Sequence, residues 1–200
     1  MISLSGFIVF ALFFLTGVLI PILWFGKLLD VIIEKSGNRG VRVGPWKTHL
    51  GVGDPKTSRI EKAAIAHVGL GGNNSEETLY WNAFYDSDGA ELTSANNYLV
   101  KFDNRPELDD KNFGFWSITV YGENKFFVPN LEKIYSINSI GNNSTEPIII
   151  SRMKPKNSER WLPLPDTNEK ISIVFRCYLP SENMRTGKIH ASDLPLILKI

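Results

Sequence analysis

The chain has 200 residues, of which 43% are hydrophobic and 12% aromatic, so it can build a substantial core and disorder throughout is excluded. Its 22 basic and 21 acidic residues give a formal net charge of +1, so no overall field attracts nucleic acid and we expect no nucleic-acid partner. A single cysteine, Cys177, excludes an intramolecular disulfide and a metal site built from several cysteines.

An apolar segment opens the chain. No charged side chain occurs between Met1 and Gly26, and the stretch "FIVFALFFLTGVLIPILWF" is apolar almost throughout. Twenty or so helical residues, at about 1.5 Å rise each, cover the roughly 30 Å hydrocarbon core of a bilayer. We therefore expect residues 1–26 to form a transmembrane anchor that meets the membrane through residues 2–25. A cleaved signal peptide is the alternative, although no Lys or Arg precedes the apolar run and no typical cleavage site follows it.

Basic residues follow the anchor, namely Lys27, Lys35, Arg39 and Arg42. The positive-inside rule would keep this flank, and the domain after it, in the cytoplasm. The stretch "KLLDVIIEK" has helical spacing, so we expect the helix to continue beyond the membrane into a juxtamembrane helix and linker over residues 27–43. The same stretch could instead serve as a face for self-association.

One helix is predicted before the strands begin, in "GDPKTSRIEKAAIAHVGLGG". Asp54 followed by Pro55 offers one N-terminal cap, and Ser58 with Glu61 offers another as a capping box. His67 falls on the apolar stripe of this helix, where a lone histidine is more often packed than catalytic.

The rest of the chain predicts short strands separated by turns. In residues 115–121 alternate side chains fall into two sets, Phe115, Ser117, Thr119 and Tyr121 on one face and Trp116, Ile118 and Val120 on the other. The second set suits a core, and the Ser/Thr/Tyr side suits solvent, a groove or a second layer. We expect residues 44–200 to be mainly β: an antiparallel β-sandwich of jelly-roll type with one short helix, preceded by the N-terminal transmembrane helix.

No catalytic motif or clustered metal-ligand pattern is present, so catalytic residues cannot be assigned and we expect no cofactor and no metal. Aromatic side chains are the better lead, because sugars and flat ligands can pack on them, although most should belong to the core. The residues we name as candidates for ligand binding are Trp46, Tyr80, Trp116, Ser117, Tyr121 and Arg176.

Several short motifs follow one another in a recognisable order: Gly44-Pro45-Trp46, the helix, "DSDGAELTSANNYLVKF", "FWSITVY", Asn130, "YSIN", "WLP" and "RCYLP". Together they resemble the bacterial family called domain of unknown function 1214, in its short membrane-anchored form, over about Gly44 to Pro180. The resemblance implies a jelly-roll β-sandwich and an envelope location, but no established reaction. Two features depart from the family pattern: Ile134 stands where members commonly carry Arg, and "GENK" replaces the acidic turn that is more usual in the family.

Three functional hypotheses remain at this point. The leading one is a single-pass membrane-anchored module that binds a small molecule, a glycan or an envelope protein without catalysis, with its soluble domain on the periplasmic or extracytoplasmic side. The alternative is an enzyme, a hydrolase or isomerase, whose site would require two or more of these residues to line one concave pocket: His67, Asp86, Arg105, Tyr121, Arg160 and Arg176. The third is a structural domain that assembles through residues 28–35 or an open sheet edge.

Overall fold

The computed structural model describes residues 4–35, 40–68, 72–140, 145–156 and 160–200. The chain folds into two compact units. The first comprises Met1–Asn38 and Pro55–Gly72, and the second comprises Arg39–Asp54 and Asn73–Ile200.

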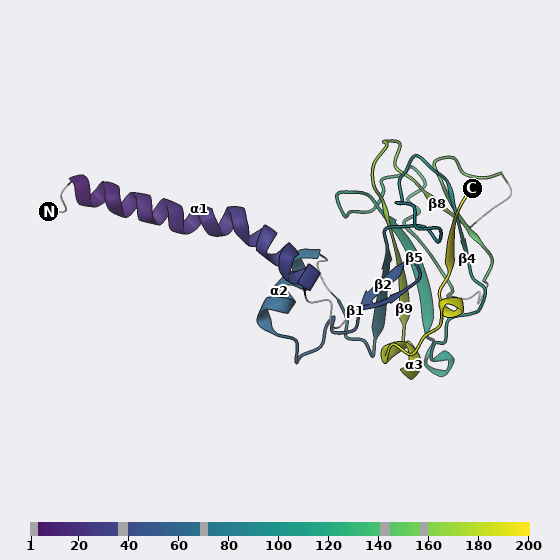
Figure 1. The fold of residues 1–200 in the computed structure, drawn as a ribbon. Coiled ribbons are helices and arrows are strands. Elements are labelled where there is room, and N and C mark those ends of the chain that lie inside the picture. The colour runs from purple at the N-terminus through teal and green to yellow at the C-terminus, as the bar shows by residue number, and fades with distance from the viewer. Residues whose placement is uncertain (1–3, 36–39, 69–71, 141–144, 157–159) are drawn as a thin grey trace. The chain divides into compact units, whose positions relative to one another are not determined.

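Two helices form the first unit, α1 (Leu4–Lys35) and α2 (Arg59–Val68). Within α1, the stretch Leu4–Phe25 is long and apolar enough to cross a membrane, a property that a signal sequence shares. The helix continues to Lys35 without a break at Pro21, as the helical spacing predicted (Figure 1).

The capping box at Ser58 and Glu61 begins α2. The Glu61 N–H donates to Oγ of Ser58 at 3.2 Å, and the Ser58 N–H donates to Oε2 of Glu61 at 3.1 Å. These reciprocal bonds satisfy two backbone donors that the first helical turn leaves unpaired. Of the two possible starts, the chain therefore uses this one. The side chain of His67 lies outside the described residues.

In the described residues, two β-sheets form the second unit (Figure 1). The six-stranded sheet has the order β1-β2-β3-β9-β5-β6, with bounds Gly40–Val43 (β1), Trp46–His49 (β2), Thr78–Ala83 (β3), Ser172–Tyr178 (β9), Phe115–Tyr121 (β5) and Ser136–Asn138 (β6). The four-stranded sheet has the order β10-β4-β7-β8, with bounds Leu196–Lys199 (β10), Tyr98–Lys101 (β4), Ile148–Ser151 (β7) and Trp161–Pro163 (β8).

The fold is mainly β, as predicted, but it differs from the expectation in three details. The pair β7–β8 is parallel, whereas every other pair of these strands is antiparallel. Short helical segments add to α2: η2 (Asp110–Asn112), α3 (Glu182–Arg185) and η3 (Ala191–Asp193), each too short to leave a helical period in the sequence. Strand β1 occupies the last four residues of the stretch expected to be a linker.

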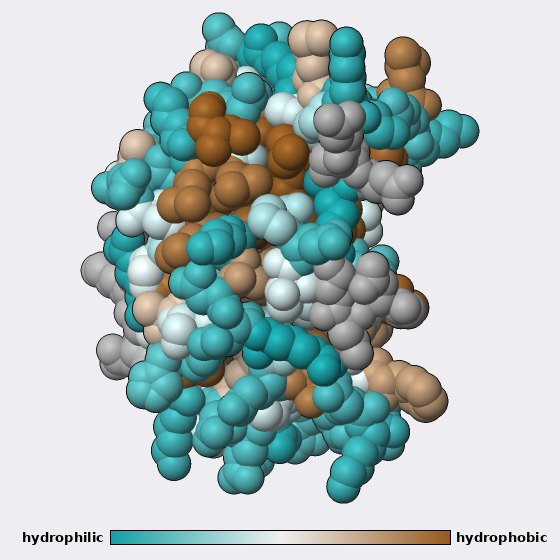
Figure 2. Space-filling model, turned by 90° about the vertical axis from the view of Figure 1, so that its right-hand side faces the viewer, coloured by the Kyte–Doolittle hydropathy of each residue, from teal (hydrophilic) through white to brown (hydrophobic). Residues whose placement is uncertain are grey.

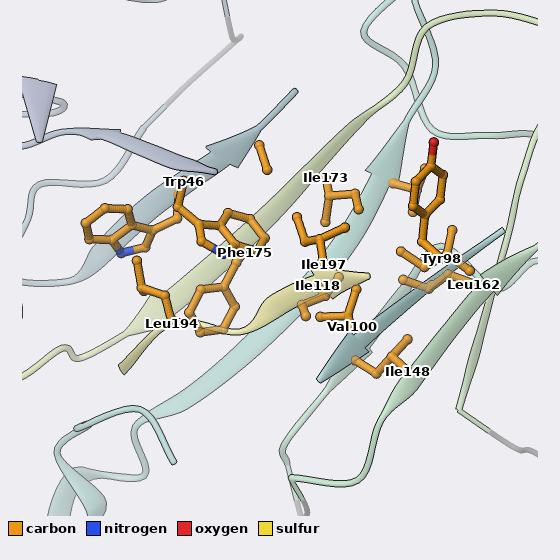
Figure 3. Close-up of a cluster of buried hydrophobic side chains, with 14 of the residues drawn as sticks. Trp46, Tyr98, Val100, Ile118, Ile148, Leu162, Ile173, Phe175, Leu194 and Ile197 are labelled. Carbon is orange, nitrogen blue, oxygen red and sulfur yellow. The ribbon is translucent and has the colours of Figure 1, made fainter. Parts of the chain in front are cut away.

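Buried side chains from both sheets meet in one hydrophobic cluster (Figure 3). Phe175 is fully buried, and its ring centre lies 5.9 Å from Trp46, 5.8 Å from Phe102 and 6.2 Å from Trp116. Cys177 is also fully buried, and this burial raises the pKa of its thiol well above the ordinary value. The thiol is therefore a small apolar core group.

The outward face of the four-stranded sheet is apolar at its centre. Leu99 on β4 stands between Leu198 on β10 and Ile149 on β7, and all three are half-buried. Hydrophobic residues gather in one area of the face of the molecule drawn in Figure 2, with hydrophilic residues around them.

Candidate ligand-binding surface

Arg176 lies in the middle of β9, on the face of the six-stranded sheet that points away from the core. Strand β9 pairs with β3 on one side and with β5 on the other, so Arg176 stands between Tyr80 and Ser117. Its chain neighbours Phe175 and Cys177 are fully buried on the core face. Because side chains alternate along a strand, the pairing fixes Tyr80, Arg176 and Ser117 on the same outward face.

Two hydroxyl groups and two aromatic rings surround the guanidinium group of Arg176. Nη1 donates to Oγ1 of Thr119 at 3.1 Å, and Nη2 donates to Oη of Tyr121 at 2.7 Å. Cζ lies 5.9 Å from the ring centre of Tyr80 and 5.7 Å from that of Tyr121, distances at which a ring attracts a cation. We define the Arg176 surface as Tyr80, Ser117, Thr119, Tyr121 and Arg176.

The positive charge of Arg176 is held by neutral groups. In the part of the chain that the structure describes, the ion pairs join Lys101 to Asp103, Arg105 to Asp110, Lys154 to Glu132 and Lys170 to Glu91, and none involves Arg176. Removing a charged group from water is costly, and an acidic partner offsets part of that cost. This surface leaves that role open to an anion from outside the chain.

Aromatic rings extend the surface beyond Tyr121. The ring of Phe127 stacks on Tyr121 with centres 5.3 Å apart, and Tyr135 lies 5.4 Å from Phe127. Phe127 and Tyr135 are both exposed. Three rings therefore follow one another from the end of β5 to the start of β6.

The strands of this sheet turn no acidic side chain outward at the positions the structure describes. Besides the Arg176 surface, the register places on this face the side chains of Arg42, Lys47, His49, Thr78, Asn82, Phe115, Ser136, Asn138, Ser172, Val174 and Tyr178. Lys, Arg and neutral residues share the face although the whole chain has 21 acidic residues. A ligand with a negative charge meets no like charge from these strands.

Hydrogen bonds fix the surroundings of Tyr80. The Asn73 N–H donates to Oη of Tyr80 at 3.0 Å, and Nδ2 of Asn73 donates to Oγ1 of Thr78 at 3.2 Å. Under the longer side chains, Thr119 is only 2% exposed, so it supports Arg176 from below.

Four of the six residues named from the sequence lie together on this face: Tyr80, Ser117, Tyr121 and Arg176. The other two lie on the core face, where Trp46 is 1% and Trp116 0% exposed. Nε1 of Trp46 donates to the Pro195 carbonyl at 2.6 Å, and Trp116 packs with ring centres 4.6 Å from Phe102. Both tryptophans therefore fill the interior. Thr119 was not among the named residues, although its place in the alternation of residues 115–121 puts it beside Tyr121.

The residues of the enzyme hypothesis lie in different surroundings. Asp86 is buried and accepts the N–H groups of Asp88 and Ala90, as a turn residue does, and Arg105 pairs with Asp110. Burial lowers the pKa of Arg160, which lies 5.4 Å from the ring centre of Trp116. Of this set, only Tyr121 and Arg176 make a described contact with each other.

Among the residues that the structure describes, no group of three or more His, Cys, Asp or Glu side chains could hold a metal ion.

A family model described as "Protein of unknown function (DUF1214)" matches residues 77–182, which include β3, β9, β5 and thus the whole Arg176 surface. The chain belongs to this family. The DUF1214 resemblance inferred from the ordered motifs is thereby confirmed. No protein with a curated description matches the chain.

Two solved structures are similar to the DUF1214 chain. The VPA0106 protein from Vibrio parahaemolyticus matches with a TM-score of 0.56 and 21% identity over 72% of this chain and 36% of its own. A putative uncharacterized protein from Burkholderia cenocepacia matches with a TM-score of 0.39 and 13% identity, over 70% of this chain and 33% of its own. The first likeness shows the fold. The chain spans about a third of the length of these two proteins.

Ile134 lies beside the core. It lines a small apolar pocket with Val120, Val128 and Leu162, and its N–H donates to Oδ1 of Asn130 at 2.9 Å. Ile134 therefore makes an apolar contact at this position.

Proposed function

We propose that this DUF1214 protein is a membrane-anchored binding module, and that the Arg176 surface binds its ligand without covalent chemistry. The observation that carries the proposal is the guanidinium group of Arg176, which is flanked by two tyrosine rings and makes its described hydrogen bonds to neutral hydroxyl groups only. An arginine in such surroundings gains most from a ligand that completes its hydrogen bonds.

The proposal assigns residues 1–26 to the anchor, residues 27–43 to a juxtamembrane segment and residues 44–200 to a β-sandwich of jelly-roll type. The two-sheet core supports the sandwich, and the apolar stretch Leu4–Phe25 supports the anchor. Trp46 and Trp116 belong to the packing of the domain, so the binding role rests on the other four named residues and Thr119.

A glycan or sugar-like ligand fits the surface better than a reacting substrate. Rings of tyrosine and phenylalanine offer flat apolar faces, and hydroxyl and amide side chains around them can hydrogen-bond to sugar hydroxyls. An enzyme would need further groups beside Tyr121 and Arg176, and their mutual hydrogen bond is the contact that favours that alternative.

Binding can be tested with the full chain in detergent micelles on an array of neutral and acidic envelope oligosaccharides. We expect the wild type to retain at least one oligosaccharide class, and Arg176→Gln to lose most of that binding because the donor fork is removed. Arg105→Gln is the matched control, since Arg105 pairs with Asp110 and contributes nothing to the Arg176 surface. Thermal melts of Arg176→Gln and Arg105→Gln check that both variants keep the wild-type melting temperature. Equal oligosaccharide binding by the wild type and the folded Arg176→Gln variant would contradict the proposal.

The envelope location is a separate part of the proposal. Basic residues after the apolar stretch favour the cytoplasm, whereas the family resemblance favours the outer side, and we propose the outer side. A reporter active only outside the cytoplasm, fused after Ile200, should give a signal, and a cytoplasm-only reporter at the same position should give none. The reverse pattern of reporter signals would show that the binding domain lies in the cytoplasm and would contradict this part of the proposal.

A further inference from the structure

We infer that the ligand of the Arg176 surface is a carboxylate-bearing sugar, with the carboxylate on the guanidinium of Arg176 and the sugar ring beside Tyr80 or Tyr121. This inference rests on the proposed binding function and names the chemical class of the ligand. It depends on the free donors, the charge and the neighbours of Arg176.

A guanidinium carries five N–H groups, and the described bonds to Thr119 and Tyr121 use one on each terminal nitrogen. Nε and a second N–H on each terminal nitrogen remain for a ligand. Pairs of such N–H groups form a planar fork that matches the two oxygens of a carboxylate.

The amount of charge favours a carboxylate over a phosphate. Arg176 supplies a single positive charge, and a carboxylate carries a single negative charge, so the two neutralise each other. A phosphate group at neutral pH carries between one and two negative charges and is commonly held by several donors or cations. Lys47, another basic side chain on this face, lies on β2, and β3 separates β2 from β9.

The neighbours favour a sugar over a simple acid. Asn82 faces outward two residues beyond Tyr80 on β3, and Asn138 faces outward on β6 opposite Ser117. Both side chains can donate and accept hydrogen bonds. Together with the ring of Tyr80, they surround the guanidinium with the chemistry that a polyhydroxylated ring requires. A bare acid such as acetate would use the guanidinium alone.

The test compares matched ligands on the full chain in detergent micelles by isothermal titration calorimetry. The probes are a glucuronic-acid disaccharide, the glucose disaccharide of the same linkage, the corresponding glucose 6-phosphate disaccharide, and acetate. We expect the uronate to bind at least about tenfold more tightly than each of the other three, since one charge-assisted bidentate pair has this order of effect. Added salt should narrow the difference between uronate and glucose.

Variants of Arg176 provide the second arm. Arg176→Gln should reduce uronate affinity to that of the glucose disaccharide, and Arg176→Lys should leave an intermediate affinity because it keeps the charge but loses the planar fork. Thermal melts check that both variants fold, and Arg105→Gln again serves as the control.

Each other outcome overturns a distinct claim. Equal binding of uronate and glucose would overturn the carboxylate and leave the proposed binding function in place. Tighter binding of the phosphate would overturn the choice of anion, and acetate as tight as uronate would overturn the sugar. If no oligosaccharide binds, on the array or in the titration, the proposed function and this inference fail together.

Discussion

Replacing Phe175 with alanine is expected to lower the free energy of unfolding by about 3–5 kcal/mol, the usual range for truncation of a buried phenylalanine. Phe175 is fully buried at the centre of the strand pair β9–β5, with Trp46, Phe102 and Trp116 around it. Alanine removes the ring from all three contacts at once and leaves a cavity that three rigid rings cannot readily fill. Loss of favourable ring geometry adds to the loss of buried area.

The change can be measured by denaturant titration of the full chain in mild detergent, followed by the near-ultraviolet circular dichroism of the buried tryptophans. Phe126→Ala is the matched control, because the same side chain at position 126 is 65% exposed and its loss should change the free energy by less than about 0.5 kcal/mol. A cost below about 1 kcal/mol for Phe175→Ala would show that the aromatic cluster does not carry the core.

Gly53→Ala is expected to lower the free energy of unfolding by about 2–5 kcal/mol, the sum of backbone strain and steric overlap. Gly53 has φ of +70°, a backbone conformation that residues with a side chain rarely adopt. A Cβ atom at this position would lie 2.5 Å from the carbonyl carbon of Asn73. That carbon cannot rotate away as a side chain could, so the segment around Asn73 must move. Because the Asn73 N–H holds the hydroxyl of Tyr80, the same change should also weaken ligand binding at the Arg176 surface.

Gly44→Ala separates strain from overlap. Gly44 has φ of +56°, but a Cβ at that position meets nothing within 4 Å. We expect Gly44→Ala to lower the free energy of unfolding by the backbone strain alone, about 1–2 kcal/mol, and to leave ligand binding at the Arg176 surface unchanged. Thermal melts and the uronate titration on both variants give the comparison, and equal costs for the two glycines would rule out the close approach of Asn73.

Patterns within a few residues predicted much of the fold. The apolar N-terminal helix, the capping box of α2 and the alternation in residues 115–121 all depend on neighbours along the chain, and each is present in the structure. The alternation also separated Trp116 from Ser117 and Tyr121, which indeed lie on opposite faces.

Contacts between segments that lie far apart in the chain could not be predicted from such local patterns. Strand β9 lies between β3 and β5, although it follows both by more than fifty residues in the chain, and local periodicity contains no information about such pairing. Trp46 was named for its aromatic surface, because a four-residue strand does not reveal which side faces the core. The bond from Thr119 to Arg176 likewise depends on the β5–β9 register.

Strand β9 has a consequence for how any ligand would be received. It pairs with β3 from Thr78 to Ala83 and with β5 from Phe115 to Tyr121, so hydrogen bonds hold the backbone of Arg176 from both sides. The side chains of its neighbours Phe175 and Cys177 are fully buried in the core. A guanidinium mounted in this way is preorganised, and a ligand has little backbone order left to impose on it. Association at this position should therefore resemble a rigid fit, with the free and occupied forms of the strand nearly superimposable.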